Sequence, residues 1–409
     1  MHDVRYAEEL ARSFDLSALP PAFYDDPFPY YHALRAYDPV LRLADGTYFL
    51  TRYADLQAVY RDTKTFTSDK HAEFGPKYGA GSLLYEHHTT SLVFNDPPLH
   101  TRVRRIIIGA LSPKAVEALE PGLIAMIDGL LETLAAKNDV DLIGDYASTI
   151  PIEVIGNLLG IPPEERAPLR EWSLAILSAL EPAPSASVQA AGNRAVADFL
   201  AYLRVLVKAR RRRPGDPERD VLTRLIQGED TGERLTETEL LHNSIFLLNA
   251  GHETTTNLIG NGLAALLDWP EQKQLLRDGP GLIESAVEEF LRFESSNQLG
   301  NRMTATPAAV GGVTLPAGTP LTLCIGAANR DPEQFPDPDR LDLRRSPNRH
   351  LAFASGPHQC AGLHIARLEA RLGISRFLRR FPDYRLRARP TRGGRARFRG
   401  FLEIPARLA

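Results

Sequence analysis

A long helical pattern near the middle of the chain constrains its fold most strongly. Thr236 and Glu239 match a capping box, in which the side chain of each residue binds the backbone N–H of the other. The pattern continues to about Asp268, which predicts a helix of roughly 50 Å at about 1.5 Å per residue. A helix of that length crosses a whole domain, so we expect a mainly α-helical fold with minor β sheets.

The centre of this predicted helix is rich in residues that weaken helices. Gly251 costs about 1 kcal/mol relative to alanine. The threonines that follow it can bend a helix by bonding back to the preceding turn. We therefore predict a bend or a local opening at Gly251. A polar stripe that faces solvent is the alternative explanation.

The minor sheets are predicted from two regions. Residues from Val40 to Thr51 alternate in polarity around Asp45-Gly46, which is a strong signal for a two-residue hairpin. Val310 to Leu323 predicts two further short strands with turns. Residues 53–62 between these regions predict a helix.

The segment from Ser68 to Leu92 has no sustained period and is rich in Gly, His and Thr. Long irregular segments inside a compact domain are either disordered or functional, and functional ones often act as lids. We predict a lid here, with His87 and His88 solvated.

Composition limits the class of protein. The chain has 409 residues, of which 43% are hydrophobic, enough for a sizeable core, and we expect one domain over residues 1–409. It has no apolar leader and no run of eighteen apolar residues, which predicts a cytoplasmic protein without a membrane anchor. Two cysteines exclude a disulfide-stapled secreted domain. A net charge of −3 gives no sign of nucleic-acid binding, and we expect a monomer.

Positive charge is concentrated near the C-terminus. Residues 363–409 contain thirteen arginines and three acidic residues, a net charge of +10. One interpretation is a solvated arginine face. The other is a docking surface that steers an acidic protein partner.

A single cysteine lies in a glycine-rich loop just before another helical pattern. The loop spans residues 353–362, and apolar residues recur at helical spacing from Leu363 to Leu378. Cys360 would lie at the helix N-terminus, which is expected to lower its pKa from roughly 8.5 and favour the thiolate. From the residues alone it could be a small buried apolar residue, a redox thiol or a metal ligand. A zinc site would use Cys360 with His350, His358 and His364.

The loop resembles the haem-binding loop of the cytochrome P-450 family, through the pattern Phe-x-x-Gly-x-His-x-Cys-x-Gly that ends at Gly362. In that family the haem iron is held by a cysteine thiolate. The resemblance implies that Cys360 ligates the iron of haem b (iron protoporphyrin IX), that Phe353 packs near the sulfur and that His358 reaches a haem propionate. The family often has glycine where Ala354 stands.

Two further segments resemble parts of the family that bind the propionates. Asp96-Pro97-Pro98 is followed by His100 and Arg104, as in the family's Asp-Pro-Pro-x-His-x-x-x-Arg segment. Arg302 stands at a further propionate-binding position. Arginine suits a carboxylate because its planar fork can bind both oxygens.

Ala250-Gly251-x-Glu253-Thr254 resembles the family's oxygen-binding groove. The resemblance implies that Thr254 and Glu253 supply protons during oxygen activation, with O2 as co-substrate. Members that use peroxide directly tend to lack this pair.

Glu289-x-x-Arg292 resembles a buried ion pair that the family places behind the cysteine loop. An exposed pair at this spacing would contribute only about 0.2–0.5 kcal/mol. Breaking a buried pair would cost about 3–5 kcal/mol.

Together these motifs predict a bacterial-type haem-thiolate monooxygenase that inserts one oxygen atom from O2 into a small apolar substrate, by hydroxylation or epoxidation. Neither a Walker loop nor a Rossmann fingerprint is present, so electrons are expected from a separate ferredoxin and reductase. A peroxide-driven peroxygenase and a non-catalytic haem-binding sensor are the alternatives. The residues expected to contact the substrate are Leu84, Leu247, Asn297, Gln298 and Leu299.

Overall fold

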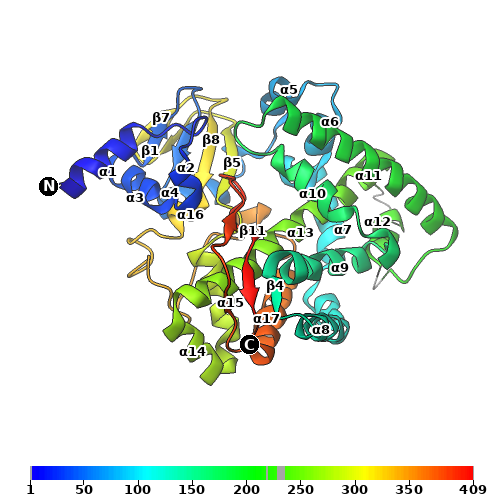
Figure 1. The fold of residues 1–409 in the computed structure, drawn as a ribbon. Helices are drawn as coiled ribbons and strands as arrows, with labels where there is room; N and C mark the ends of the chain where they lie inside the picture. Colours follow the sequence, from blue (N-terminus) through cyan, green and yellow to red (C-terminus); the bar gives the residue numbers. More distant parts are fainter. Residues whose placement is uncertain (1, 218–219, 228–234, 409) are drawn as a thin grey trace.

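A computed structural model of the chain describes residues 2–217, 220–227 and 235–408. In these ranges a large helical region lies beside a smaller region that holds the main β-sheet (Figure 1). None of the helices there has both the length and the apolar sequence that a membrane span requires. The α-helices are α1 (His2–Arg12), α2 (Pro21–Asp25), α3 (Phe28–Tyr37), α4 (Tyr53–Arg61), α5 (His71–Tyr78), α6 (Leu83–Thr90), α7 (Leu99–Ala110), α8 (Pro113–Ala135), α9 (Thr149–Leu158), α10 (Leu169–Ser178), α11 (Ala186–Arg212), α12 (Val221–Gln227), α13 (Glu237–Asp268), α14 (Pro270–Asp278), α15 (Ile283–Phe293), α16 (Ile325–Ala328) and α17 (Leu363–Arg380).

Helix α13 passes through the centre of the molecule and confirms the predicted long helix (Figure 1). The backbone N–H of Glu239 donates to Thr236 Oγ1 at 3.2 Å, and the backbone N–H of Thr236 donates to Glu239 Oε2 at 2.8 Å. The predicted capping box is therefore present. Most of α13 is buried, and it packs against α9, α10 and α17.

The local opening predicted as one alternative at Gly251 is not found, because α13 is helical from end to end. Glycine has a packing role instead, since a Cβ at position 251 would lie 2.7 Å from Cδ1 of Ile155 on α9. The alternative of a solvent-facing polar stripe is also wrong. The polar residues of this stretch that are buried are Asn249, His252, Glu253, Thr255, Thr256 and Asn257.

The main sheet has five strands in the order β1-β2-β8-β5-β3. The predicted hairpin is confirmed, with Val40 opposite Leu50 and a positive φ of 84° at Gly46 in the turn. Strands β2 and β8 pair in parallel, and β8 pairs with β5 in antiparallel register. The strands are β1 (Val40–Arg42), β2 (Tyr48–Leu50), β3 (Phe66–Thr67), β4 (Asp139–Asp141), β5 (Leu299–Thr304), β6 (Ala308–Val310), β7 (Val313–Leu315), β8 (Pro320–Cys324), β9 (Arg385–Leu386), β10 (Thr391–Arg392), β11 (Phe401–Glu403) and β12 (Pro405–Arg407).

The segment predicted as an irregular lid contains two short helices, α5 and α6. Helix α6 starts at an N-cap in which Ser82 Oγ accepts a hydrogen bond from the backbone of Tyr85, and it packs on α11 and α13. His87 and His88 are 2% and 1% exposed, so the prediction that they are solvated is wrong. Helices of eight residues are stabilised by tertiary packing, which leaves little periodic signal in the sequence.

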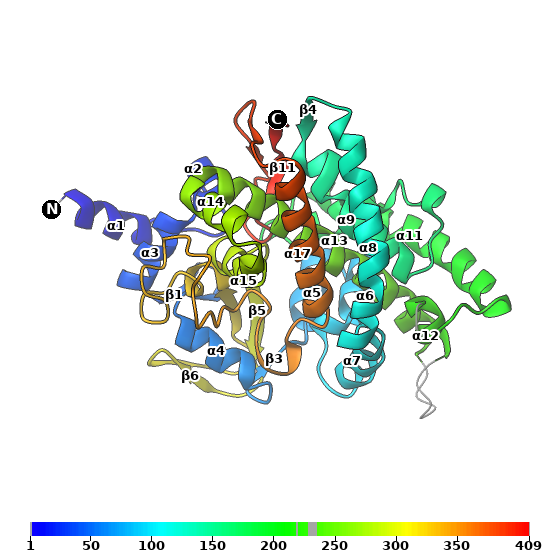
Figure 2. The same ribbon diagram turned by 90° about the horizontal axis from the view of Figure 1, so that it is seen from below.

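The arginine-rich C-terminal segment is largely neutralised by carboxylates from the rest of the chain. Helix α17 lies beside α8 (Figure 2), where Arg376 pairs with Asp128. Ten of the thirteen arginines lie within 4.0 Å of a described carboxylate. The charge of +10 is therefore not presented to solvent as one block. Arg379, Arg385 and Arg397 have no such partner among the described residues.

Candidate active site

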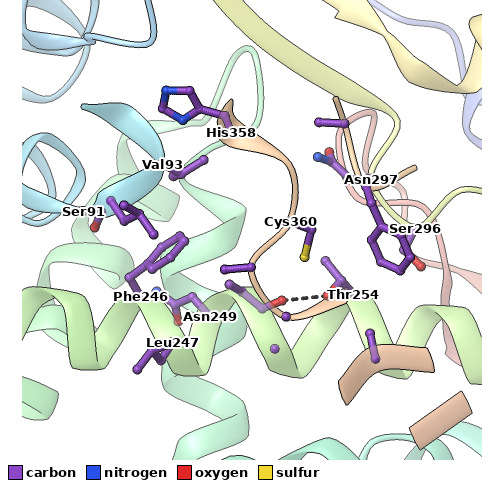
Figure 3. A pocket seen from close by; sticks show the side chains of 18 of the residues that line it. Ser91, Val93, Phe246, Leu247, Asn249, Thr254, Ser296, Asn297, His358 and Cys360 are labelled. Atoms are coloured by element: carbon purple, nitrogen blue, oxygen red, sulfur yellow. Dashed lines mark hydrogen bonds between the residues drawn. The ribbon is translucent and has the colours of Figure 1, made fainter. Parts of the chain in front are cut away.

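A cavity of about 330 Å³ lies between the cysteine loop and the middle of α13. Figure 3 shows the sulfur of Cys360 pointing toward the part of α13 that carries Thr254. The start of α7, strand β5 and the last residues of α10 complete the wall. The volume lies in the range of small-molecule and cofactor sites.

The backbone of the loop sets the position of Cys360. Its N–H donates to the carbonyl of Phe353 at 2.9 Å, which closes the loop on itself. Gly356 has a φ of 72°, and a Cβ there would lie 2.5 Å from the carbonyl oxygen of Tyr60. Only glycine fits this approach without a shift of backbone.

Ala354 lies in the left-handed region, with a φ of 55°. A left-handed conformation costs an L-residue with a Cβ about 1–2 kcal/mol. The loop therefore stores strain at the position where the family often has glycine.

Burial is the largest influence on the pKa of the cysteine. It raises the pKa of the Cys360 thiol, against the opposing effects of the Gly362 backbone N–H and the guanidinium groups of Arg104 and Arg367. The expectation that the helix N-terminus lowers this pKa is therefore wrong for the protein alone, because loss of water outweighs the local dipole.

Cys324 and Cys360 are both free thiols. The described residues contain no group of three or more His, Cys, Asp or Glu side chains that could hold a metal ion. The zinc alternative is therefore not formed. His350 binds Glu288 at 3.2 Å, and His364 is exposed.

His100 and His358 stack beside the cavity. Their ring centroids are 3.9 Å apart, and the rings are inclined by 32°. Both side chains are buried, and the Nε2 atoms have no hydrogen-bond partner. His358 Nε2 lies 3.7 Å from Asp96 Oδ1, which is too long for a hydrogen bond. The two imidazoles are therefore available to a further polar group.

Arg302 and Arg104 add positive charge to the same wall. Arg302 is 6% exposed, its Nε has no partner, and its Nη1 donates only to the carbonyl of Asn301 at 2.7 Å. Burial lowers the pKa of both guanidinium groups. Among the described residues neither arginine has a carboxylate within 4.0 Å. Buried cations without counter-charges suit an anionic ligand.

Residues 175–278 and 281–385 match the protein family described as Cytochrome P450. The chain belongs to the cytochrome P450 family. The vitamin D(3) 25-hydroxylase of Pseudonocardia autotrophica is 40% identical over 368 residues, which are 89% of this chain and 88% of that protein. The biotin biosynthesis cytochrome P450 of Bacillus subtilis (strain 168) is 35% identical over 391 residues, 94% and 96% of the two chains.

The fold agrees with this assignment. The structure of P450BioI in complex with an acyl carrier protein ligated to hexadec-9Z-enoic acid superposes with a TM-score of 0.89 at 33% identity. The match covers 95% of this chain and 99% of that one. As a cytochrome P450, the chain is a haem-binding oxidoreductase that incorporates oxygen.

The residues around the cavity fit a haem. A free thiol faces the cavity, and the unpartnered atoms His100 Nε2, His358 Nε2 and Arg302 Nε lie in its wall. Two propionates would satisfy these donors and offset the uncompensated cations.

The middle of α13 forms the wall opposite Cys360. Ala250, Gly251 and Thr254 all line the cavity. The hydroxyl of Thr254 donates to the carbonyl of Ala250 at 2.7 Å (Figure 3). Its oxygen keeps lone pairs that can accept a proton donor from the cavity side.

Glu253 lies outside this lining, although it is next to Thr254 in the chain. It is 2% exposed, and its Oε1 accepts a hydrogen bond from Arg395 of the C-terminal segment. Its Oε2 and Nη1 of Arg395 have no partner. Glu253 and Thr254 thus face different surroundings in this state of the protein.

Glu289 and Arg292 form the buried pair that the sequence pattern suggested. Both side chains are 0% exposed, and Arg292 binds both carboxylate oxygens at 2.8 Å. Glu289 also accepts from Arg345 at 3.2 Å and from Asn348 at 3.0 Å. The pair fixes the segment that leads into the cysteine loop.

The residues expected to contact the substrate divide into two groups. Leu247, Asn297 and Leu299 line the cavity. Leu84 and Gln298 do not: Leu84 packs against Gly192 of α11, and Gln298 Nε2 donates to the carbonyl of Ser295 at 2.7 Å. Of residues 296–302, all except Gln298 line the cavity, so the segment was predicted correctly but the one side chain that turns away was not.

Other lining residues were missed. His87 and Asn249 meet at the cavity wall, where Asn249 Nδ2 lies 3.3 Å from His87 Nε2. Arg397 and Phe398 reach the cavity from the C-terminal segment, through a bridge between Phe398 and Asn297. The arginine-rich sequence predicted a concentration of positive charge, but it did not predict which of its residues contact the cavity.

Proposed function

We propose that this cytochrome P450 is a monooxygenase that inserts one atom of O2 into a substrate with an apolar body. Haem b would be held by Cys360 at the iron and by His100, Arg104, Arg302 and His358 at the propionates, with Phe353 and Gly362 shaping the loop. The chain would act as one monomeric catalytic domain, with electrons from a separate ferredoxin-type protein. The resemblance of the ordered motifs to the family supports each of these assignments.

A single observation carries the proposal: one cavity brings together a free cysteine thiol, unpartnered buried donors and the Thr254 hydroxyl. When bound, haem supplies redox chemistry at iron, and thiolate ligation favours O–O cleavage. The chain's own residues bind the propionates, neutralise their charge and exclude bulk water from the cavity.

Thr254 is the proposed proton-handling group on the cavity wall. Its hydroxyl can hold an ordered water or donate a proton at Oγ1, since its present bond is to the local carbonyl of Ala250. Glu253 is the proposed link to bulk solvent. For that role its ion pair with Arg395 must open, because the carboxylate lies outside the cavity lining.

The walls near α10 and α13 support an apolar substrate, since they present Leu177, Phe246, Leu247 and Leu258. Two similar proteins act on or hold largely apolar molecules by their names: a vitamin D(3) hydroxylase and a P450 with an acyl chain bound. We propose hydroxylation or epoxidation of such a molecule.

The experiment is the absorption spectrum of the reduced carbon monoxide complex. Cys360→Ser should abolish the shifted band that marks thiolate ligation. Cys324→Ser is the matched control, because Cys324 is buried in β8 outside the cavity lining. A shifted band that survives in Cys360→Ser would refute the ligand assignment.

Turnover measurements distinguish the monooxygenase from the two alternatives, a peroxide-driven peroxygenase and a non-catalytic haem-binding sensor. The proposal expects O2 consumption and product with a surrogate ferredoxin system. Product formation from peroxide alone, at a higher rate than with O2 and reductase, would instead establish a peroxygenase. No O2 consumption with any donor would favour a sensor.

A further inference from the structure

Arg397 is a cation on the cavity wall whose geometry is fixed but whose charge is not compensated. Its Nε and Nη1 donate to the carbonyls of Leu180 and Leu299 at 3.0 and 2.8 Å, and its Nη2 donates to Asn301 Oδ1 at 2.5 Å. All three acceptors are neutral. These bonds use three of the five N–H groups of a guanidinium.

Neighbouring arginines of the same segment are paired. Arg395 binds Glu253, and Arg399 binds Glu294. For Arg397, no carboxylate oxygen of the described residues lies within 4.0 Å. From Arg387 to Arg407 every described arginine except Arg397 has a carboxylate within 4.0 Å, and Arg397 is the one that lines the cavity.

A second cation, Lys77, lies near Arg397 but outside the residues that line the cavity. Lys77 of α5 donates from Nζ to the carbonyl of Glu181 at 2.8 Å, next to the Leu180 carbonyl that Arg397 binds. Burial and the charge of Arg397 lower the pKa of Lys77 to about 8. The Glu181 carboxylate accepts the backbone N–H groups of Ala396 and Arg397 at 2.9 and 3.1 Å. Glu73 also interacts with Lys77 and Arg397, but it is paired with Lys70 at 2.6 Å, so three cations share two carboxylates.

We propose that Arg397 binds the carboxylate end of the substrate, with Lys77 behind it adding positive charge, and that the apolar body of the substrate extends along Leu177 and Leu247 toward Cys360. A carboxylate suits the remaining N–H groups of Arg397, because charge-assisted bonds to a fixed fork are strong and directional. This inference rests on the proposed function of the same cavity, and it restricts the substrates to amphipathic carboxylic acids.

The test is isothermal titration calorimetry on the haem-loaded protein with tetradecanoate, methyl tetradecanoate and tetradecyl phosphate. The wild type should bind tetradecanoate at least about tenfold more tightly than the methyl ester. Equal affinity for acid and ester would overturn the proposal. Tighter binding of the phosphate than of the acid would overturn the carboxylate assignment.

Substitutions at Arg397 and Lys77 test which side chains cause the preference for the acid. Arg397→Gln should weaken the binding of tetradecanoate about tenfold or more and leave the binding of the methyl ester unchanged. Arg397→Lys should keep part of the preference for the acid over the ester. Lys77→Met should have a smaller effect of the same sign. Arg385→Gln is the control, because this exposed arginine lies in the same segment outside the cavity. Equal loss for acid and ester in Arg397→Gln would contradict the subsite.

The carbon monoxide spectrum keeps this result separate from the proposed function. If the wild type shows the shifted band but no preference for the acid, the carboxylate subsite fails alone. If the band is absent, haem-thiolate ligation fails whatever the calorimetry shows. If Arg397→Gln does not fold, the calorimetry of Lys77→Met and the acid–ester comparison in the wild type test the carboxylate subsite.

Discussion

The imidazole rings of His100 and His358 stack with their centroids 3.9 Å apart, one from α7 and the other from the loop before Cys360. Neither Nε2 atom has a hydrogen-bond partner. Two ring nitrogens without partners are thus available on neighbouring imidazoles. This arrangement supports the propionate site that we propose.

Removal of either imidazole should speed haem loss. A hydrogen bond to a charged group contributes about 1.5–3 kcal/mol, so His100→Ala and His358→Ala should each release hemin about 10- to 100-fold faster. Transfer of hemin to an excess of a haem-free acceptor protein measures the rate. His71→Ala serves as control, since His71 is exposed and outside the cavity. Unchanged rates in both variants would rule out propionate contacts.

Thr254→Ala should retain haem but divert electrons into peroxide, because the hydroxyl that we propose handles protons on the cavity wall is lost. Product formed per electron consumed should fall severalfold, with peroxide rising in proportion. Thr256→Ala is a matched control, because Thr256 makes the same back-bond, to His252 at 2.9 Å, but lies outside the cavity lining. Equal coupling in the two variants would argue against the role of Thr254.

Stability should fall on acidification because His88 is buried as the neutral imidazole. Burial lowers its pKa to about 3, whereas an unfolded histidine titrates near 6.5. Between these values the unfolded state binds the extra proton. The contribution of His88 to the free energy of unfolding should therefore be complete above pH 6.5 and be lost below it, by up to about 1.4 kcal/mol per pH unit.

The variant His88→Phe isolates this contribution. The ring of His88 contacts Phe74, Tyr78 and Phe94, so phenylalanine suits the site. Urea unfolding of this variant at several pH values between 7 and 4.5 should show a shallower decline than the wild type. His71→Phe, at an exposed position, should keep the full slope. Parallel declines in all three proteins would contradict the assignment.

Ala354→Gly should stabilise the protein by about 1 kcal/mol, since glycine adopts the observed φ of 55° without strain. Ala352→Gly, just before the loop, is the control and should destabilise by about 0.4–1 kcal/mol, because Ala352 is not among the residues with positive φ. Thermal unfolding of both variants measures the difference. Destabilisation by Ala354→Gly would show that the Cβ packs favourably.

The sequence predicted features that depend on local chemistry. The capping box at Thr236, the hairpin turn at Gly46 and the helix after Cys360 each follow from residue type and spacing within one element. The family assignment was also within reach, because the cysteine-loop motif lies in ten consecutive residues.

Features that depend on tertiary contacts were not predicted. Nothing local shows that Gly251 makes room for Ile155, that His87 is buried under α11 and α13, or which acids the C-terminal arginines reach. The pKa of Cys360 also depends on tertiary contacts that the sequence did not show. Its position before a helix pointed to a lowered pKa, but burial by distant segments reverses the direction.

The pairing of the C-terminal arginines has a consequence for biosynthesis. Arg376, Arg395 and Arg399 join the last part of the chain to acids on α8, on α13 and after α15, and Arg397 and Phe398 close one side of the cavity. A nascent chain that still lacks these residues leaves that side open to water. Stable capture of a prosthetic group should therefore follow the synthesis and docking of residues 395–399.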